Sequence, residues 1–167
     1  ASGVVPQITA IFGNCGGGLA VVPALTDFTF MEEKSAKLFV NSPNAIPGNT
    51  VQKCDTSSAK FQSESAGLVD AVGTEEEILS DIRSLICMLP CNNEEDASYD
   101  ECTDDLNRLC ADIENAAEDT AIALAQISDN GVVFEVKKDY AKDMVTAFIR
   151  LNGMTVGAVA NRSKVYN

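Results

Sequence analysis

Apolar residues fall into two kinds of run along this chain. Short runs rich in aromatic and branched residues predict strands at 4–12, 28–31, 38–40 and 132–136. The first run is followed by six residues rich in glycine, 13–18, and then by a stretch at 19–25 that predicts a short helix. The order strand, glycine turn and helix is typical of an α/β fold.

The clearest helix signal lies at 74–89. Thr74, followed three residues later by Glu77, predicts a capping box, and Pro90 predicts the end of the helix. Apolar residues recur between them at helical spacing and are expected to face the core: Ile78, Ile82, Leu85, Ile86 and Leu89.

Three weaker helix signals complete this pattern. Ser42-Pro43-Asn44 predicts a helix start, with Ser42 as the cap, and the polar stretch 49–66 is expected to be loop with short elements. A helix is predicted at 103–113, with four side chains inward: Leu106, Leu109, Cys110 and Ile113. Another is predicted at 116–128, where Asn130-Gly131 stops it.

The last stretch predicts a β-hairpin. Residues 144–151 and 155–160 both alternate between apolar and polar positions, and Asn152-Gly153 lies between them. Both turn residues tolerate the positive φ that a type I′ turn requires. The charge also changes here, because residues 71–131 carry sixteen acidic and two basic residues, whereas 132–167 carry three and six. We therefore expect a second subdomain to begin near residue 132.

Composition excludes several classes of chemistry. The absence of histidine rules out a Ser-His or Cys-His nucleophile pair and any histidine-ligated metal. The six cysteines form no C-x-x-C pair, so we expect no metal site, but reduced thiols, several at helical core positions. The net charge of −13 argues against nucleic acid, and the acidic stretch is interpreted as a solvated helical surface.

The sequence also carries signals about location. No apolar run approaches the 18 residues of a membrane-spanning helix, and the first residues lack the pattern of a signal peptide. A cytoplasmic location is therefore expected. The chain begins at Ala1, without a methionine and directly before an expected strand, so it is expected to be a piece of a longer protein.

The glycine-rich stretch is the main candidate for chemistry. Its sequence, Gly13-Asn14-Cys15-Gly16-Gly17-Gly18, matches neither the dinucleotide-binding loop, nor the P-loop, nor the nucleophile elbow. Glycines between a strand and a helix allow a ligand to approach backbone amides at the positive end of the helix. An oxyanion hole or a simple tight turn remains. Cys15 is interpreted as structural, because it has no histidine partner.

Three ordered motifs resemble the carboxyltransferase subunits of propionyl-CoA and related biotin-dependent acyl-CoA carboxylases. The first comprises Val5-Pro6-Gln7-Ile8, the glycine stretch, and Pro23-Ala24-Leu25-Thr26-Asp27-Phe28. The second comprises Ser65-Ala66-Gly67-Leu68-Val69-Asp70 and Glu75-Glu76-Glu77. The third comprises Phe134-Glu135-Val136, Asp139-Tyr140-Ala141-Lys142, and Arg150-Leu151-Asn152-Gly153 followed after one residue by Thr155-Val156-Gly157.

The resemblance implies an incomplete α/β crotonase-like (ClpP/crotonase) spiral of ββα units. Residues 1–90 would end the N-terminal half, 91–131 would form an acidic helical connector, and 132–167 would start the C-terminal half. The implied reaction is carboxyl transfer between carboxybiotin and an acyl-CoA through a thioester enolate. Backbone N–H groups of Gly17 and Gly18 would form the oxyanion hole.

The same resemblance also implies which residues contact the substrate, and which cofactor and partner subunits take part. Gly16 and Leu19 would contact the substrate, and no metal is implied. Biotin would be carried on a partner, so biotin carboxylase and biotin carrier subunits are the expected partners. The full-length subunit would be a homo-oligomer, and this fragment would be inactive alone.

Three alternatives remain open. The chain could belong to a biotin-dependent acyl-CoA decarboxylase, to a noncatalytic assembly segment, or to another crotonase-type enzyme such as a hydratase, although no acid or base glutamate beside the loop supports the last. One departure from the family also stands out. Residues 55–60 occupy the region where the family usually has a G-G-x-x-x-H segment.

Overall fold

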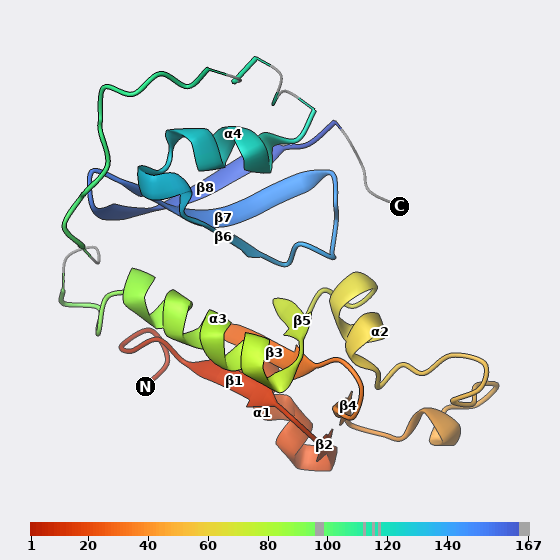
Figure 1. The fold of residues 1–167 in the computed structure, drawn as a ribbon. Coiled ribbons are helices and arrows are strands. Elements are labelled where there is room, and N and C mark those ends of the chain that lie inside the picture. The colour runs from red at the N-terminus through yellow and green to blue at the C-terminus, as the bar shows by residue number, and fades with distance from the viewer. Residues whose placement is uncertain (96–98, 112, 115, 117, 164–167) are drawn as a thin grey trace. The chain divides into compact units, whose positions relative to one another are not determined.

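The computed structural model describes residues 1–95, 99–111, 113–114, 116 and 118–163. The chain divides into two compact units, Ala1–Arg83 and Ser84–Asn167 (Figure 1). The boundaries expected from the family resemblance, at 90 and 131, remain a prediction. Asp96 and Asp112, two acidic residues of the expected connector, lie outside the described residues.

The first unit contains two small parallel sheets. One has the order β1-β3-β5, formed by Ile8–Ile11, Phe28–Glu32 and Ala71–Gly73. The other pairs β2, Asn14–Gly16, with β4, Lys37–Phe39. The parallel arrangement confirms the α/β prediction for this unit.

Four helical segments connect these strands, and helix α3 follows β5 and continues past the end of this unit at Arg83. The 3₁₀-helix η1, Gly17–Ala20, continues into α1, Val21–Leu25. The 3₁₀-helix η2 spans Pro43–Ala45, α2 spans Ala59–Glu64, and α3 spans Glu75–Met88.

A core cluster in the first unit joins the strands to the glycine-rich stretch. It includes Ile11 of β1, Cys15 of β2, Met31 of β3 and Leu38 of β4, all nearly fully buried. The buried carboxylate of Asp70 accepts a hydrogen bond from Thr29 N at 2.7 Å, and Asp70 N donates back to Thr29 O. This exchange fixes the chain at the entrance to β5 against β3.

Several predicted elements of this unit need correction. The first strand begins at Ile8 rather than at residue 4, because Val4 and Val5 donate to the carbonyl of Ala1 in a turn. The glycine-rich stretch contains a short strand, β2, since its backbone pairs with β4. Ser42 caps only one 3₁₀ turn rather than a full helix. In 49–66, the expected short element is the six-residue helix α2.

Helix α3 confirms the strongest sequence signal. Thr74 N donates to Glu77 Oε2 at 2.8 Å and Glu77 N donates to Thr74 Oγ1 at 3.3 Å, which is the reciprocal capping box. Ile78 and Leu85 are buried as predicted. Ile86 is exposed instead, and Met88 takes the inward position one turn after Leu85.

The second unit is built on an antiparallel sheet. Its strands are β6, Val133–Val136, β7, Met144–Leu151, and β8, Met154–Asn161, in the order β6-β7-β8. Asn152 and Gly153 take positive φ values of 51° and 81°, which confirms the predicted hairpin turn. Helix α4, Thr120–Ile127, lies across this sheet and contacts all three strands (Figure 1).

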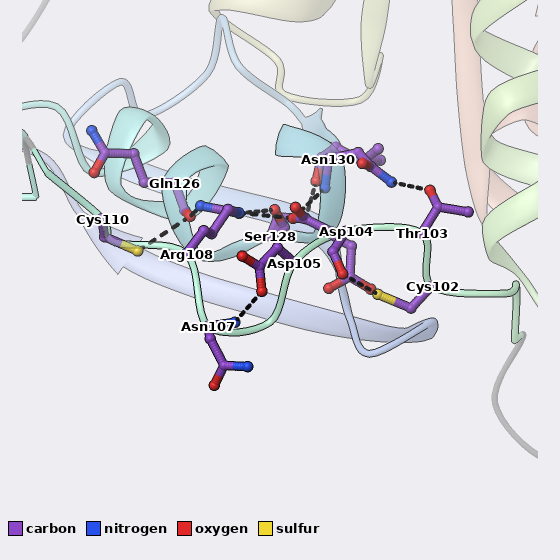
Figure 2. A network of polar contacts seen from close by, with 12 residues as sticks. Cys102, Thr103, Asp104, Asp105, Asn107, Arg108, Cys110, Gln126, Ser128 and Asn130 are labelled. Carbon is purple, nitrogen blue, oxygen red and sulfur yellow. Dashed lines mark hydrogen bonds and ion pairs between the residues drawn. The ribbon is translucent and has the colours of Figure 1, made fainter.

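The helix predicted at 103–113 is wrong: the described residues of this stretch form turns. Figure 2 shows the polar network that holds them, in which Arg108 Nε donates to Asp104 Oδ2 at 2.8 Å and Arg108 Nη2 to Ser128 O at 2.8 Å. Asn130 N also donates to Asp104 Oδ2, at 2.9 Å. The apolar residues that were expected to face inward are not packed into a core, since Leu109 is 90% exposed. The hydrogen bonds that Asp104 and Arg108 make with residues 128–130 therefore stabilise turns here more than the weak helical pattern stabilises a helix.

The helix predicted at 116–128 is shorter than expected. It begins at Thr120 because Asp119 caps it, accepting a hydrogen bond from Ala121 N at 3.2 Å. Ala117 lies outside the described residues. The 3₁₀ turn η4, Asp129–Gly131, follows α4, as the Asn-Gly signal indicated.

Two further expectations concerned the burial of the cysteines and the presence of a membrane-spanning helix. All six cysteines are free, but only Cys15 is buried, and it lies on a strand, so the expected helical core positions are wrong. No helix among the described residues is long and apolar enough to cross a membrane.

Candidate oxyanion loop

The glycine-rich stretch forms a strand-to-helix turn, called here the glycine loop (residues 13–18). Gly16 is the last residue of β2 and the N-cap of η1, with extended φ and ψ values of −125° and 161°. Gly17 follows with a φ of +63°, a conformation that side chains disfavour. The chain therefore changes direction at Gly17, and the amides that follow it begin η1.

The glycines of the loop serve different physical purposes. A Cβ atom on Gly16 would lie 2.8 Å from Phe39 Cε2, so the ring of Phe39 occupies the space of a side chain. Gly17 is required by its positive φ. A Cβ on Gly17 or Gly18 would meet no atom within 4 Å, so the space over both residues is open. A ligand can therefore approach the backbone at these two positions.

Strand β4 holds the loop in place. Lys37 N donates to Gly13 O at 3.0 Å, and the parallel register pairs Asn14 with Lys37 and Gly16 with Phe39. The loop is thus supported by a strand whose paired residues lie 23 positions later in the sequence. Local sequence patterns cannot reveal this support, and sequence reasoning missed Phe39 for that reason.

A cavity of about 300 Å³ lies beside the loop. One wall is β1 with the residues that follow it, and the other is the start of the helical segment. The lining residues include Thr9, Ile11, Gly13, Cys15, Leu19 and Val22. The lining is mostly apolar, so it suits a small apolar group.

The four predicted site residues lie in one turn. Gly16, Gly17, Gly18 and Leu19 are consecutive, and the side chain of Leu19 is 62% exposed. Within the described part of the chain, no side chain caps the N-terminus of η1. Uncapped amides at the start of a helical turn suit a carbonyl oxygen that develops negative charge. The arrangement therefore leaves room for an oxygen atom that carries negative charge beside these amides.

Cys15 supports this interpretation. Its side chain is buried in the core cluster, and burial raises the pKa of the Cys15 thiol. A raised pKa keeps the thiol neutral and unreactive. The structural role predicted for Cys15 is therefore the one that its surroundings favour.

Comparison with known proteins decides the family. Residues 1–166 match the carboxyl transferase domain. The chain belongs to the carboxyl transferase domain family. It is 40% identical to the carboxyltransferase subunit of propionyl-CoA carboxylase from Haloferax mediterranei, over 99% of this chain and 34% of that protein. It is 37% identical to the alpha subunit of methylmalonyl-CoA decarboxylase from Propionigenium modestum, over 98% and 34%.

Solved structures agree with this carboxyl transferase assignment. A structure of transcarboxylase 12S, described as a hexamer with hydrolysed methylmalonyl-coenzyme A bound, superposes with a TM-score of 0.87 at 34% identity, covering 96% of this chain and 33% of that one. A single-chain long-chain acyl-CoA carboxylase shares the fold, with a TM-score of 0.74 at 21% identity. The predicted α/β crotonase-like fold is confirmed. The chain spans about a third of the curated relatives that it matches.

Residues 55–60, where a departure from the family's pattern is expected, lead into α2 and contact β4. Asp55 Oδ2 accepts a hydrogen bond from Lys37 Nζ at 2.7 Å, and Ser58 caps α2 through Phe61 N at 3.3 Å. Lys37 belongs to β4, the strand that supports the glycine loop. The segment therefore stabilises the back of the loop rather than offering a free catalytic group.

Proposed function

We propose that this domain takes part in carboxyl transfer between carboxybiotin and an acyl-CoA, and that the glycine loop holds the thioester oxygen of the acyl-CoA. The backbone N–H groups of Gly17 and Gly18 would donate to that oxygen as the substrate becomes an enolate. The observation that carries the proposal is the uncapped turn at Gly17, with open space over Gly17 and Gly18, in a chain of the carboxyl transferase family. One such donor contributes about 3–4 kcal/mol to a transition state.

The substrate side of the proposal follows from the cavity. The apolar lining beside the loop, which includes Leu19, suits the acyl group, and Gly16 would contact the substrate from the start of η1. Propionyl-CoA and methylmalonyl-CoA are the acyl-CoA compounds in the names of the relatives, so a short acyl chain is the proposed substrate class.

The remaining partners belong to the full-length subunit. When bound, biotin supplies or accepts the carboxyl group, and biotin carboxylase and biotin carrier subunits are the proposed partners. A hexamer like that of transcarboxylase 12S is the proposed assembly, in the cytoplasm. Within the subunit, residues 1–90 would end the N-terminal half and 132–167 would start the C-terminal half, joined by 91–131.

The test is transfer of the carboxyl group from carboxybiotin to propionyl-CoA by the full-length subunit. Gly17→Val places a branched side chain at a φ of +63° and displaces the amides, so we expect kcat to fall about 100-fold or more. Gly157→Val is the matched control, because a Cβ there meets no atom within 4 Å and the residue lies on β8. Unchanged kcat in Gly17→Val would contradict the oxyanion role and favour a noncatalytic assembly segment.

A decarboxylase is the second candidate, favoured by the identity of 37% to the methylmalonyl-CoA decarboxylase subunit. Both reactions pass through the same thioester enolate, so the glycine loop would serve either one. Net decarboxylation of methylmalonyl-CoA and net carboxylation of propionyl-CoA, both measured with the partner subunits present, separate the two candidates. A purely decarboxylating subunit would perform the first reaction when coupled to its partners and would not support net carboxylation.

A further inference from the structure

The turn between β3 and β4, residues 33–36, is organised by one carboxylate. Glu32, the last residue of β3, accepts hydrogen bonds from Lys34 N at 3.0 Å, Ser35 Oγ at 2.7 Å and Ala36 N at 3.2 Å. Ser35 N donates to the same carboxylate. A single side chain therefore binds three consecutive amides and one hydroxyl.

This turn touches the glycine loop at its entrance. Ser35 Oγ also lies 3.2 Å from the carbonyl oxygen of Phe12, the residue immediately before the loop, and its single hydrogen can point to this oxygen or to the Glu32 carboxylate. One residue after the turn, Lys37 N donates to Gly13 O at 3.0 Å. Phe12 and Gly13 also line the cavity beside the loop. The turn and the first residue of β4 thus each make one polar contact with the loop entrance.

The turn also determines where β4 begins. Strand β4 starts directly after it, and its register sets β2, since Lys37 pairs with Asn14 and Phe39 pairs with Gly16. A shift of the turn would move β4, and with it the amides that follow Gly16. Small displacements of a catalytic group of about 1 Å can cost 100-fold in rate.

We propose that Glu32 is a positioning residue for the glycine loop, acting through the 33–36 turn and Ser35 on the backbone at Phe12 and Gly13. The inference rests on the proposed function for its effect on catalysis. The geometry of the contacts is independent of that function.

The ionised state of Glu32 is suited to this role. The Ser35 hydroxyl, followed by the amides of Ser35 and Lys34, lowers the pKa of Glu32 to about 2. The side chain therefore stays charged at neutral pH and accepts charge-assisted bonds. Glutamine has the same shape, but its NH₂ group replaces one acceptor by a donor that would face N–H groups. Glu32→Gln is thus a small change that breaks the clamp.

The test compares Glu32→Gln with Glu33→Gln in the full-length subunit, using carboxyl transfer to propionyl-CoA. Glu33 is the neighbouring acid. The contact described for its carboxylate is a surface ion pair, 3.2 Å between Glu33 Oε1 and Lys34 Nζ. We expect Glu32→Gln to lower kcat about 10-fold with KM for propionyl-CoA within about twofold, because the misplaced amides act mainly on the transition state. Glu33→Gln should match the wild type. Equal kcat in both variants and the wild type would overturn the proposal, as would equal losses in the two variants.

A second variant tests the path of the effect. Ser35→Ala removes the hydroxyl that contacts both Glu32 and Phe12, and it should lower kcat in the same direction. If the two residues act through one contact, Glu32→Gln/Ser35→Ala should lose much less than the product of the two single losses. Fully multiplicative losses would contradict this path.

Hydrogen exchange of the loop separates this inference from the proposed function. Glu32→Gln should speed exchange at the amides of residues 13–18 several-fold, and Glu33→Gln should not. A wild-type subunit without carboxyl transfer would contradict the proposed function alone, and the exchange result would still decide the positioning role. Unchanged exchange in Glu32→Gln overturns that role.

Discussion

At the scale of single residues, the glycine loop shows how far composition can carry an inference. Three adjacent glycines indicate a turn or a ligand site, but they do not tell which one is required. Gly16 faces the ring of Phe39 and Gly17 has a φ of +63°, whereas Gly18 has neither constraint from a neighbouring atom within 4 Å nor a positive φ. The reason for Gly16 lies 23 positions away and becomes visible only when β2 pairs with β4.

The pKa of Glu32 gives a prediction at this scale. Its pKa falls from a usual 4.5 to about 2 in the folded state, so the folded form is favoured by the charged carboxylate. Its contribution to stability is fully present above about pH 4.5 and is lost as the pH falls through about 2. We expect the protection of the Lys34 and Ser35 amides, corrected for intrinsic exchange, to fall over this interval.

Glu32→Gln supplies the comparison for that experiment. It should flatten the pH dependence of protection at these two amides, while Glu33→Gln should keep it. A wild-type protection that stays constant between pH 4.5 and 2 would contradict the assignment of the low pKa to Glu32.

At the scale of elements, signals that need only neighbours in sequence were predictable. The capping box at Thr74 and the turn at Asn152 and Gly153 form as the sequence predicts, because all their partners lie within a few residues. The helix prediction at 103–113 was wrong because the partners of this stretch lie far away in the sequence. Arg108 and Asp104 bond to residues near 128–130, more than twenty residues away from Asp104, and no helical pattern anticipates those bonds.

The hairpin of the second unit carries a prediction of its own. The buried carboxylate of Asp129 accepts hydrogen bonds from Asn152 N at 3.0 Å and Gly153 N at 2.6 Å, so it holds the hairpin turn. The Gly153 amide, the largest cause, and the Asn152 amide lower the pKa of Asp129. Asp129→Ala should lower the opening free energy of the β7 and β8 amides by about 2–3 kcal/mol, measured by hydrogen exchange.

The exposed Asp143, beside the start of β7, provides the matched substitution. Asp143→Ala should change the opening free energy by less than about 0.5 kcal/mol. Equal hydrogen-exchange protection of the hairpin amides in Asp129→Ala and Asp143→Ala would show that the turn is stable without the Asp129 carboxylate.

At the scale of the whole molecule, family motifs identified the family and the fold, which residue patterns alone did not specify. The residues alone allowed an oxyanion hole or a tight turn, and the motifs that run from Val5 to Gly157 identified the carboxyl transferase family that residues 1–166 match. The crotonase-like fold followed from those motifs as well, because no local pattern specifies the parallel pairing of β1 with β3 or of β2 with β4. The chain spans about a third of the length of these relatives.

The central claim is that the glycine loop holds the thioester oxygen, and a crystal structure of the full-length subunit with propionyl-CoA bound tests it most directly. We expect the thioester oxygen within about 2.7–3.1 Å of the amide nitrogens of Gly17 and Gly18, with the acyl group in the cavity beside Leu19. A thioester oxygen bound to other groups, with both amides facing solvent or protein, would contradict the account.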